Sequence, residues 1–296
     1  MIKILNLSML QVMIACASSF VVIKDGQEKM SPFTFSTIRF VLAALGFSPF
    51  LGKAMKQPKL FFPAVDVGFW AASAYLAQSV SLLYTDASRG ALMSAATVLV
   101  VPVLEACFGS NKLHKSHLIA ALLAIFGIFL IEGDGVPTRL GDFWSFVSAC
   151  LFGVQIFRTE YWSKQLGPES FLPMISLALV VISIISILGT VIVERLASSP
   201  MLLVPFQFSS FHEVPWFEII YMAFVVTNFG LWAEVVALQY VTSLEAAIVY
   251  TLEPILGAMM GAMLLGESTF HGFGWMGAGM VTLSQLVPTL SERWNK

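Results

Sequence analysis

Apolar blocks of about 18 to 25 residues recur from one end of the chain to the other, separated by short polar connections. As a helix, a block of this length crosses the ~30 Å hydrocarbon core of a lipid bilayer. Of the 296 residues, 57% are hydrophobic and only 11% are charged, whereas soluble domains carry about 25% charged residues. The sequence therefore predicts an integral membrane protein with almost no chain left for a soluble domain.

Ten of these blocks are candidate transmembrane spans, and no strand-like alternation runs through them. We expect helices because each helix satisfies its own backbone hydrogen bonds in lipid. The spans end near residues 23, 52, 84, 109, 132, 162, 194, 240, 266 and 289. The prediction is an all-α polytopic membrane protein with ten transmembrane helices.

The lysines and arginines of the connections are divided unequally between the two faces of the membrane. The face with both termini carries nine of them, namely Lys3, Lys53, Lys56, Lys59, Lys112, Lys115, Lys164, Arg293 and Lys296, and the other face carries Lys24, Lys29, Arg89, Arg139 and Arg195. Since cytoplasmic connections are enriched in these residues, both termini are predicted to be cytoplasmic. The net charge of −2, without a polybasic segment, argues against nucleic acid as a partner.

The two halves of the chain resemble each other. Aligning Cys16 with Cys150 brings Lys24 onto Arg158, and later "LLYTDASRGALMSAATVLV" resembles "ALQYVTSLEAAIVYTLEPIL". We therefore predict two repeats of five helices, residues 1–136 and 137–296, although oily segments always share some similarity. Because five is odd, the second repeat would cross the membrane in the opposite sense. Many secondary transporters use such an inverted repeat to exchange two access states around a midplane site.

The second half is similar to the second EamA repeat of the drug/metabolite transporter superfamily. The features are Pro254 midway along span nine, Gly266-Glu267 at its end and a Gly-rich span ten. The first half agrees through "TIRFVLAAL" and "YTDASRGALMSAATVLVVPVLEACF", but it has Asn111 where an acid is usual and its proline, Pro102, one turn late. The resemblance implies a ten-helix carrier of small metabolites, without enzymatic activity or a cofactor. It does not specify the solute or the direction of transport.

Ionisable residues inside the predicted spans are candidate functional groups, because an unpaired ion at the bilayer centre costs at least ~2.5 kcal/mol. Five residues qualify by position, namely Arg39, Asp66, Glu105, Glu234 and Glu253. Glu105 and Asp66 lie near the predicted cytoplasmic ends, where their side chains are expected to reach water. The other three are the stronger candidates.

Glu253 is the first candidate because it lies near the predicted midplane, next to Pro254. The proline ring displaces the carbonyl of Tyr250, so a kink is expected. A freed carbonyl beside a carboxylate suits a proton, a cation or an amine, and coupling to protons through Glu253 is a hypothesis. The alternative is structural, with Glu253 capping a helix or pairing with Arg39.

Arg39 is always charged and needs a counter-ion, so it is either a structural partner or the group that binds a substrate carboxylate. In span eight, Asn228 and Trp232 share one helix face and Glu234 points elsewhere, so either face is a candidate lining of the pathway. Other polar and aromatic side chains complete the predicted cavity, namely Ser18, Ser19, Tyr75, Gln78, Ser94, Thr97, Trp144, Gln155, Tyr250 and Thr251. Aromatic walls with few charges favour a small amphipathic solute.

Two motifs are excluded as cofactor or metal sites. The glycines from Gly272 to Gly277 fit a dinucleotide-binding spacing, but no strand precedes them, so we interpret them and Gly257-x-x-x-Gly261 as close helix contacts. His114 and His117 have no further ligands nearby, so no metal is predicted.

The sequence thus predicts a secondary transporter, monomeric or homodimeric in the bilayer, that moves a small amino-acid-like or aromatic solute by alternating access. Pro254 and Pro102 are the expected kinks of its pathway. The alternatives are a membrane scaffold or receptor that retains the transporter fold, and an intramembrane enzyme.

Overall fold

A computed structural model describes most of the chain. The described residues are 2–97, 100, 103–104, 107, 115–132, 140–196, 214–232, 253–267 and 272–294. Every regular element in these residues is a helix, in agreement with the all-helical prediction.

The first half of the chain contributes seven helical elements. They are α1 (Ile2–Lys29), α2 (Pro32–Gly46), α3 (Ser48–Met55), the short 3₁₀-helix η1 (Pro58–Leu60), α4 (Phe61–Tyr84), α5 (Ala87–Ser94) and α7 (Lys115–Glu132). The second half contributes α8 (Leu140–Leu166), the 3₁₀-helix η2 (Pro168–Ser170), α9 (Phe171–Leu196), α10 (Trp216–Ile220), the π-helix η4 (Tyr221–Phe229), α13 (Glu253–Leu264) and α14 (Gly272–Trp294).

Prolines fix where several of these helices begin. Pro32, Pro58 and Pro168 each occupy the first position of a helical element, where a missing N–H leaves no hydrogen bond unmade. The second predicted span is broken: α2 and α3 meet at an angle of 69° beside Phe47. Pro49 explains the break, because it cannot donate a hydrogen bond to the carbonyl four residues earlier.

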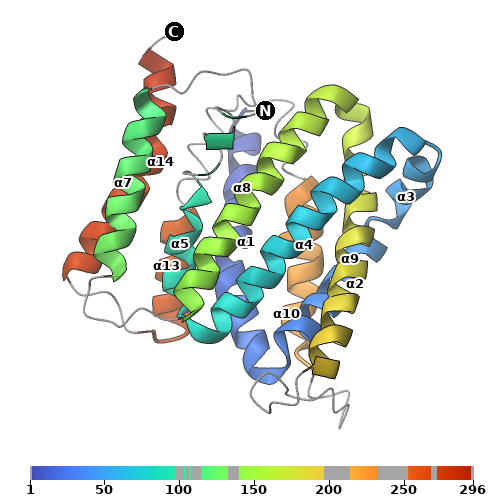
Figure 1. Ribbon diagram of the computed structural model, residues 1–296, viewed down its shortest axis with the longest axis horizontal. Helices are drawn as coiled ribbons and strands as arrows, with labels where there is room; N and C mark the ends of the chain where they lie inside the picture. Colours follow the sequence, from blue (N-terminus) through green and yellow to red (C-terminus); the bar gives the residue numbers. More distant parts are fainter. Residues whose placement is uncertain are drawn as a thin grey trace.

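The helices form a bundle with one separate pair (Figure 1). α2, α4, α8 and α9 pack side by side, and α1, α5 and α13 lie next to them. α10 and η4 pack against α1 and α2, while α7 and α14 pack mainly against each other. In Figure 1 the N-terminal end of α1, α3, η2 and the C-terminal end of α14 lie at one end of the bundle, here called the upper end. The turn between α4 and α5 and the start of α8 lie at the lower end.

Long apolar helices cross the bundle from end to end. Three of them, Pro58–Tyr84, Leu140–Trp162 and Pro168–Ile192, are long and apolar enough to span a membrane, and the bent pair α2–α3 is a fourth if counted as one span. Shorter apolar helices cover Ile119–Ile131, Trp216–Trp232 and Glu253–Leu264. Each predicted span therefore contains helix, and the number of ten crossings stays a prediction.

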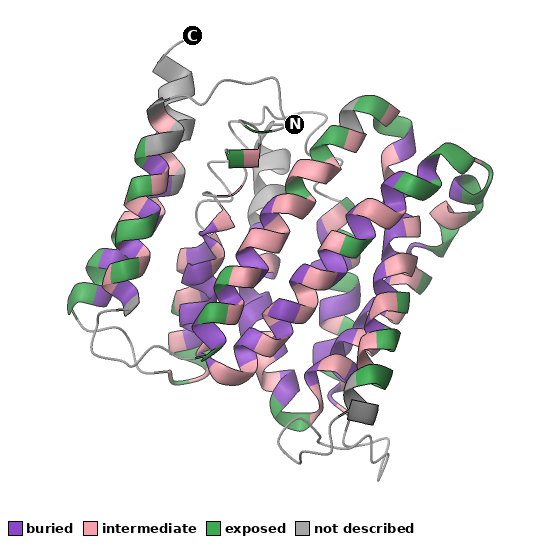
Figure 2. Cartoon of the chain, in the orientation of Figure 1, coloured by how far each residue is buried: buried purple, intermediate pink, exposed green. Residues whose placement is uncertain are grey.

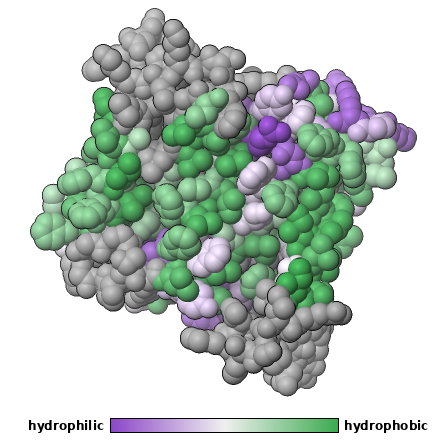
Figure 3. Space-filling view, viewed as in Figure 1, coloured by the Kyte–Doolittle hydropathy of each residue, from purple (hydrophilic) through white to green (hydrophobic). Residues whose placement is uncertain are grey.

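The bundle exposes apolar side chains on its sides. Phe126 and Phe129 on α7 and Ile184 and Leu188 on α9 are exposed, and exposed residues lie along the outer faces of the helices in Figure 2. On the face seen in Figure 3, hydrophobic residues cover the sides, and hydrophilic residues gather at the upper end over α3. A lipid environment explains this distribution, since a large apolar surface is unfavourable in water.

Small residues allow close helix contacts at the places where the sequence predicts them. A Cβ atom on Gly277 would lie 2.5 Å from the Gly127 carbonyl oxygen of α7, and one on Gly257 would lie 2.8 Å from the Ala91 Cβ of α5. A Cβ atom on Gly261 would lie 2.8 Å from the backbone nitrogen of Ser88. These three glycines are therefore packing positions, as predicted. The same interpretation is wrong for Gly272, where a Cβ atom would meet no atom within 4 Å.

Candidate functional site

Arg39 lies at the centre of the bundle and is only 4% exposed. Its Nε and Nη2 atoms donate hydrogen bonds to Thr227 Oγ1 of η4, at 3.3 and 3.1 Å. The guanidinium carbon lies 4.7 Å from the centre of the Phe40 ring and 5.1 Å from that of Tyr75. The charge is therefore held by one hydroxyl and two aromatic faces, a weaker environment than a carboxylate.

Aromatic rings from both halves of the chain surround this arginine. The Tyr75 ring of α4 lies 4.9 Å from the Phe40 ring of α2. It also meets the Phe152 ring of α8 edge to face, with centroids 5.0 Å apart. The sequence-predicted residues Arg39 and Tyr75 are thus brought together, at a point where helices of the two halves meet.

The π-helix η4 positions the partner of Arg39. Thr227 Oγ1 donates to the carbonyl oxygen of Met222, five residues earlier, at 2.8 Å. Its own lone pairs therefore face the guanidinium. Single π-helical turns are uncommon and occur often at functional sites. Sequence periodicity gives no sign of this turn, so Thr227 was not among the predicted site residues.

Asn228 follows Thr227 and lies at a close contact between η4 and α2. A Cβ atom on Gly46 would lie 1.9 Å from the Asn228 Nδ2 atom, so only glycine fits there. The Oδ1 atom of Asn228 is buried, and it has no hydrogen-bond partner among the described residues. A buried acceptor of this kind is available to a bound donor or a water molecule.

Arg39 forms no ion pair with a carboxylate in the described part of the chain. The predicted pairing with Glu253 is therefore not found. A buried charge without a counter-ion is strongly unfavourable. A guanidinium in this position has the geometry to bind a carboxylate in two parallel hydrogen bonds. Chemically, a guanidinium held by one hydroxyl and two ring faces can accept an anionic ligand.

A second polar contact joins α1 to the same π-helix. The hydroxyl oxygens of Ser18 and Tyr221 are 2.8 Å apart, and Ser18 also donates to the Ala15 carbonyl oxygen at 2.7 Å. Ser19, the next residue, is buried. Two predicted cavity residues of α1 thus lie in the bundle interior, and one of them contacts η4.

Several predicted cavity residues bond to the helices around them. Ser94 Oγ donates to the Ala91 carbonyl oxygen at 2.6 Å, and Thr97 Oγ1 donates to the Ser94 carbonyl oxygen at 2.7 Å. Gln155 Nε2 donates to Thr159 Oγ1 at 2.8 Å. These contacts fit helix packing, so the three residues are weaker candidates than Arg39.

The remaining predicted aromatic and amide residues lie apart from one another. Trp144 is half-buried and its ring meets that of Phe143, at 5.9 Å. Trp232 is exposed beside Phe229, with ring centroids 6.0 Å apart. Gln78 is half-buried on α4. None of these three contacts Arg39 by a bond or ring contact in the described residues.

Glu253 is half-buried and is the first residue of α13. Pro254 therefore lies in the first turn, where its missing N–H is tolerated and where a carboxylate is favoured by the helix dipole. The expected kink depends on Tyr250, which lies outside the described residues. The other predicted residues outside them are Glu234, Thr251, Pro102 and Glu105.

Asp66 forms a link between the two halves instead of reaching water alone. Its Oδ2 atom lies 2.5 Å from Arg158 Nη2 and accepts a hydrogen bond from Trp162 Nε1 at 2.8 Å. The Asp66 and Arg158 side chains are 14% and 28% exposed. The expected snorkelling is therefore not observed, and α4 and α8 are joined near the upper end.

A buried ion pair, missed from the sequence, joins α5 to α8 at the lower end. Arg89 Nη2 lies 3.1 Å from Asp142 Oδ2, and the two side chains are 4% and 3% exposed. Thr85 Oγ1 donates to Asp142 Oδ1 at 2.5 Å. We placed Arg89 in a connection. The sequence signal for this pair is the opposite charge of Asp142, which lies at the end of another predicted span. In the structure the neighbouring Gly141 allows α8 to approach α4, because a Cβ atom there would lie 2.5 Å from the Ser81 carbonyl oxygen.

Glu267, the acid of the Gly-Glu pair, caps the start of α5. Its carboxylate accepts hydrogen bonds from the backbone nitrogens of Ala87 and Ser88, at 2.6 and 2.9 Å, and one from the Ser88 hydroxyl. A negative charge at a helix N-terminus is favourable. This acid therefore has a structural role between the two halves.

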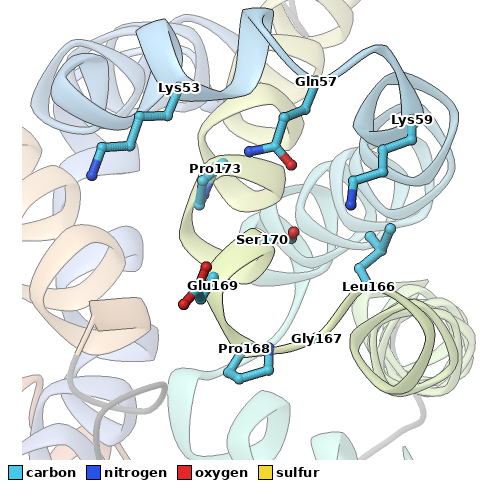
Figure 4. A pocket seen from close by; sticks show the side chains of 9 residues that line it. All are labelled: Lys53, Gln57, Lys59, Leu166, Gly167, Pro168, Glu169, Ser170 and Pro173. Atoms are coloured by element: carbon cyan, nitrogen blue, oxygen red, sulfur yellow. The ribbon is translucent and has the colours of Figure 1, made fainter.

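A separate pocket of about 760 Å³ opens at the upper end of the bundle, between α3 and the start of α9 (Figure 4). Its lining residues are Lys53, Gln57, Lys59, Leu166, Gly167, Pro168, Glu169, Ser170 and Pro173. No predicted site residue is among them. This pocket is therefore separate from the buried surroundings of Arg39.

Comparisons with known proteins agree with this architecture. Residues 3–133 match the EamA-like transporter family. An uncharacterized transporter of Archaeoglobus fulgidus is 23% identical over 96% of this chain and 85% of its own length. A probable amino-acid metabolite efflux pump of Escherichia coli is 24% identical over 97% of this chain and 95% of its own length. A protein of known crystal structure shares the fold, with a TM-score of 0.62 and 14% identity over 99% of each chain.

Proposed function

We propose that this chain, in which residues 3–133 match the EamA-like transporter family, is a membrane transporter of the drug/metabolite transporter superfamily and moves a small organic carboxylate by alternating access. The observation that carries the proposal is Arg39, a central buried cation without a carboxylate partner in the described residues. A substrate carboxylate supplies the missing counter-charge in the loaded state.

The surroundings of Arg39 favour an amino-acid-like or aromatic solute. Phe40 and Tyr75 offer ring faces to an apolar side chain, and Asn228 offers a buried acceptor to a donor such as an amine. A polyphosphate would need several cationic side chains in one place. The relative from Escherichia coli is named a probable amino-acid metabolite efflux pump, and this name fits the same class of solute.

The pattern of helix contacts supports an inverted repeat. If the first five predicted helices exchange with the last five, the pair α4–α8 becomes η4–α1, and the pair α4–α9 becomes η4–α2. The pair α5–α8 likewise becomes α13–α1. All six pairs are in contact in the structure. The contacts α2–α9, α5–α13 and α7–α14, which the exchange maps onto themselves, are also present. A carrier of this kind exposes its midplane site to each side in turn.

Two ion pairs are also related by this exchange of the first five helices with the last five. Asp66, early in the third predicted helix, pairs with Arg158 of the sixth near the upper end. Glu218, early in the eighth, pairs with Lys29 of the first near the lower end, at 2.5 Å. Each pair joins one half to the other, and the two lie at opposite ends. We propose that they close the two ends alternately, because opening an end requires its pair to separate.

Proton coupling through Glu253 stays a hypothesis in this scheme. Its half-buried position at the start of α13 allows access to water and to the bundle interior. If the pH dependence of transport is the same in Glu253→Gln as in the unaltered protein, Glu253 is not the coupling group.

The substrate class is tested by ligand-induced stabilisation, since a ligand that binds only the folded state raises its melting temperature. Purified protein is screened with paired compounds that differ only in their carboxylate, such as an aromatic amino acid and the matching amine. We expect Arg39→Gln to abolish the stabilisation by the acid. The control Lys56→Gln removes an exposed positive charge outside the proposed site and outside the two closing pairs, and it should retain this response.

Transport itself is tested by counterflow of the labelled acid in proteoliposomes. A carrier exchanges the label, whereas a scaffold or receptor with the same fold binds without exchange. If the acid stabilised Arg39→Gln as much as it stabilises the unaltered protein, the role of the guanidinium would be contradicted, whether or not counterflow is observed.

A further inference from the structure

The pocket at the upper end has the character of an anion site. Lys53 lines it from α3 and Lys59 from η1, and Gln57 lies between them. Both lysine side chains are exposed at the pocket, and neither forms an ion pair with a described residue. Two ammonium groups within one concave surface attract a phosphate more strongly than either alone.

The opposite wall adds backbone polarity. α9 is 26 residues long and begins at Phe171, directly after the lining segment 167–170. The positive end of its dipole is therefore at the pocket, and helix N-termini commonly bind phosphate. Gly167 has a φ of 77°, a conformation that favours glycine, and this turn places η2 along the wall.

A serine adds a hydroxyl to the wall of the pocket. Ser170 lines the pocket and the residue is only 6% exposed. Its hydroxyl has no hydrogen-bond partner among the described residues. Figure 4 shows this side chain in the wall between the lysines and Glu169. A hydroxyl held in the pocket wall without a protein partner is available to donate to a bound phosphate oxygen.

The position of the pocket relative to lipid identifies the source of the phosphate. α3 leaves the direction of α2 at 69°, so the segment from Ser48 runs along the end of the bundle. Met55, Phe61 and Phe62, which alternate with the lysines along this segment, are exposed. Lysines interspersed with exposed apolar residues are typical of segments that lie at the membrane–water interface. The pocket is thus expected at headgroup depth on the predicted cytoplasmic face.

From this arrangement we propose that the pocket binds the phosphate of a phospholipid headgroup. Lys59 contacts the phosphate and the Ser170 hydroxyl donates to it. Lys53, whose ammonium group points away from Lys59 in Figure 4, attracts the headgroup from the edge of the pocket, and the acyl chains lie along Phe61 and Phe62. Glu169, at the pocket edge, faces the outer part of the headgroup. A bound lipid would hold α3 against the start of α9. The proposal requires insertion in a membrane and is independent of what the protein transports.

Native mass spectrometry of the full chain in detergent measures the binding, with phosphatidylglycerol as the probe. A lysine at a membrane surface contributes enough for about a fivefold change in affinity. We therefore expect Lys53→Gln and Lys59→Gln each to weaken binding about fivefold. The matched control is Lys56→Gln, which removes the same charge from the same exposed segment but does not line the pocket. This control should bind like the unaltered protein.

Two further arms distinguish the sources of the ligand. Diacylglycerol, which lacks the phosphate, should not occupy the site, and inorganic phosphate should not displace the lipid at equal concentration. Displacement by inorganic phosphate would mean a soluble-ion site and would overturn the proposal. An equal loss in Lys56→Gln would mean diffuse attraction to the surface and would also overturn it. Melting temperatures of the exposed lysine variants check that each remains folded.

Discussion

The buried ion pair between Arg89 and Asp142 gives the sharpest prediction about stability. In Asp142→Asn the side chain keeps its shape, but its charge is lost and Arg89 stays buried. The pair joins α5 to α8, and both side chains are at least nine-tenths buried. We therefore expect Asp142→Asn to lower the stability strongly, because it removes the carboxylate charge while the side-chain volume stays nearly the same.

The magnitude follows from the burial. Removing one partner of a buried pair costs about 3–5 kcal/mol, because the other charge is left without compensation. Asp142 also accepts hydrogen bonds from Arg89 Nε at 3.4 Å and from Thr85 Oγ1 at 2.5 Å. An asparagine retains one acceptor, so part of the Thr85 bond survives. The expected decrease in the free energy of unfolding is about 3–4 kcal/mol.

The assay is equilibrium unfolding of purified protein in a mild detergent, followed by circular dichroism. The matched control is Asp66→Asn at the second pair between the halves, whose partner Arg158 is 28% exposed. Because water screens this pair, the loss should be about 1 kcal/mol or less. A double variant, Arg89→Met with Asp142→Leu, removes both charges and should recover most of the stability.

Two results would refute the reasoning. If Asp142→Asn lost no more stability than Asp66→Asn, the buried environment of the pair would be wrong. If the double variant were as unstable as the single variant, an uncompensated charge would not be the cause. In that case the loss would come from packing around α5 and α8.

Three further outcomes are expected. Gly277→Leu should lower the melting temperature of the protein by several degrees, because its Cβ atom would lie 2.5 Å from the Gly127 carbonyl oxygen; Gly279→Leu, where a Cβ atom meets no atom within 4 Å, is the control. Glu267→Gln should lower the free energy of unfolding by about 1 kcal/mol through loss of the charged cap of α5, an effect that high salt reduces. Lys29 donates to Asp25 and holds the pKa of that carboxyl below its usual value of 3.8. The stabilisation from Asp25 is thus present above pH ~4 and is lost as the pH falls through the lowered pKa; unfolding curves between pH 5 and about 2.5 should show a smaller acid loss in Lys29→Met.

The positions of the helices could be predicted because the apolar blocks and the prolines at their ends are local signals. The all-helical class is confirmed, and the interpretation of Gly257, Gly261 and Gly277 as packing positions agrees with their contacts. Local sequence was sufficient in these cases because the cause of the structure is itself local.

The ion pairs could not be predicted because they depend on which helices are neighbours. Asp66 and Arg158 are 92 residues apart in the chain, and Arg89 and Asp142 are 53 apart. The broken second span was also missed, although Pro49 is a visible cause. The π-helix that positions Thr227 follows from tertiary packing, and no residue pattern predicts it.

The arrangement of charges itself distinguishes structure from function in this protein. The described ion pairs lie near the ends of the helices, where Asp66 meets Arg158, Arg89 meets Asp142 and Lys29 meets Glu218. Arg39 differs from them, because it is central and its partners are a hydroxyl and ring faces. An arginine that only stabilised the bundle would be expected to have a carboxylate partner as well, since an unpaired buried charge lowers stability. The stability lost by burying Arg39 without a carboxylate partner is understandable if a negatively charged solute binds to it during each transport cycle. A permanent counter-ion would compete with the solute for Arg39 in both access states, so the lack of a carboxylate partner among the described residues leaves the guanidinium available to the solute.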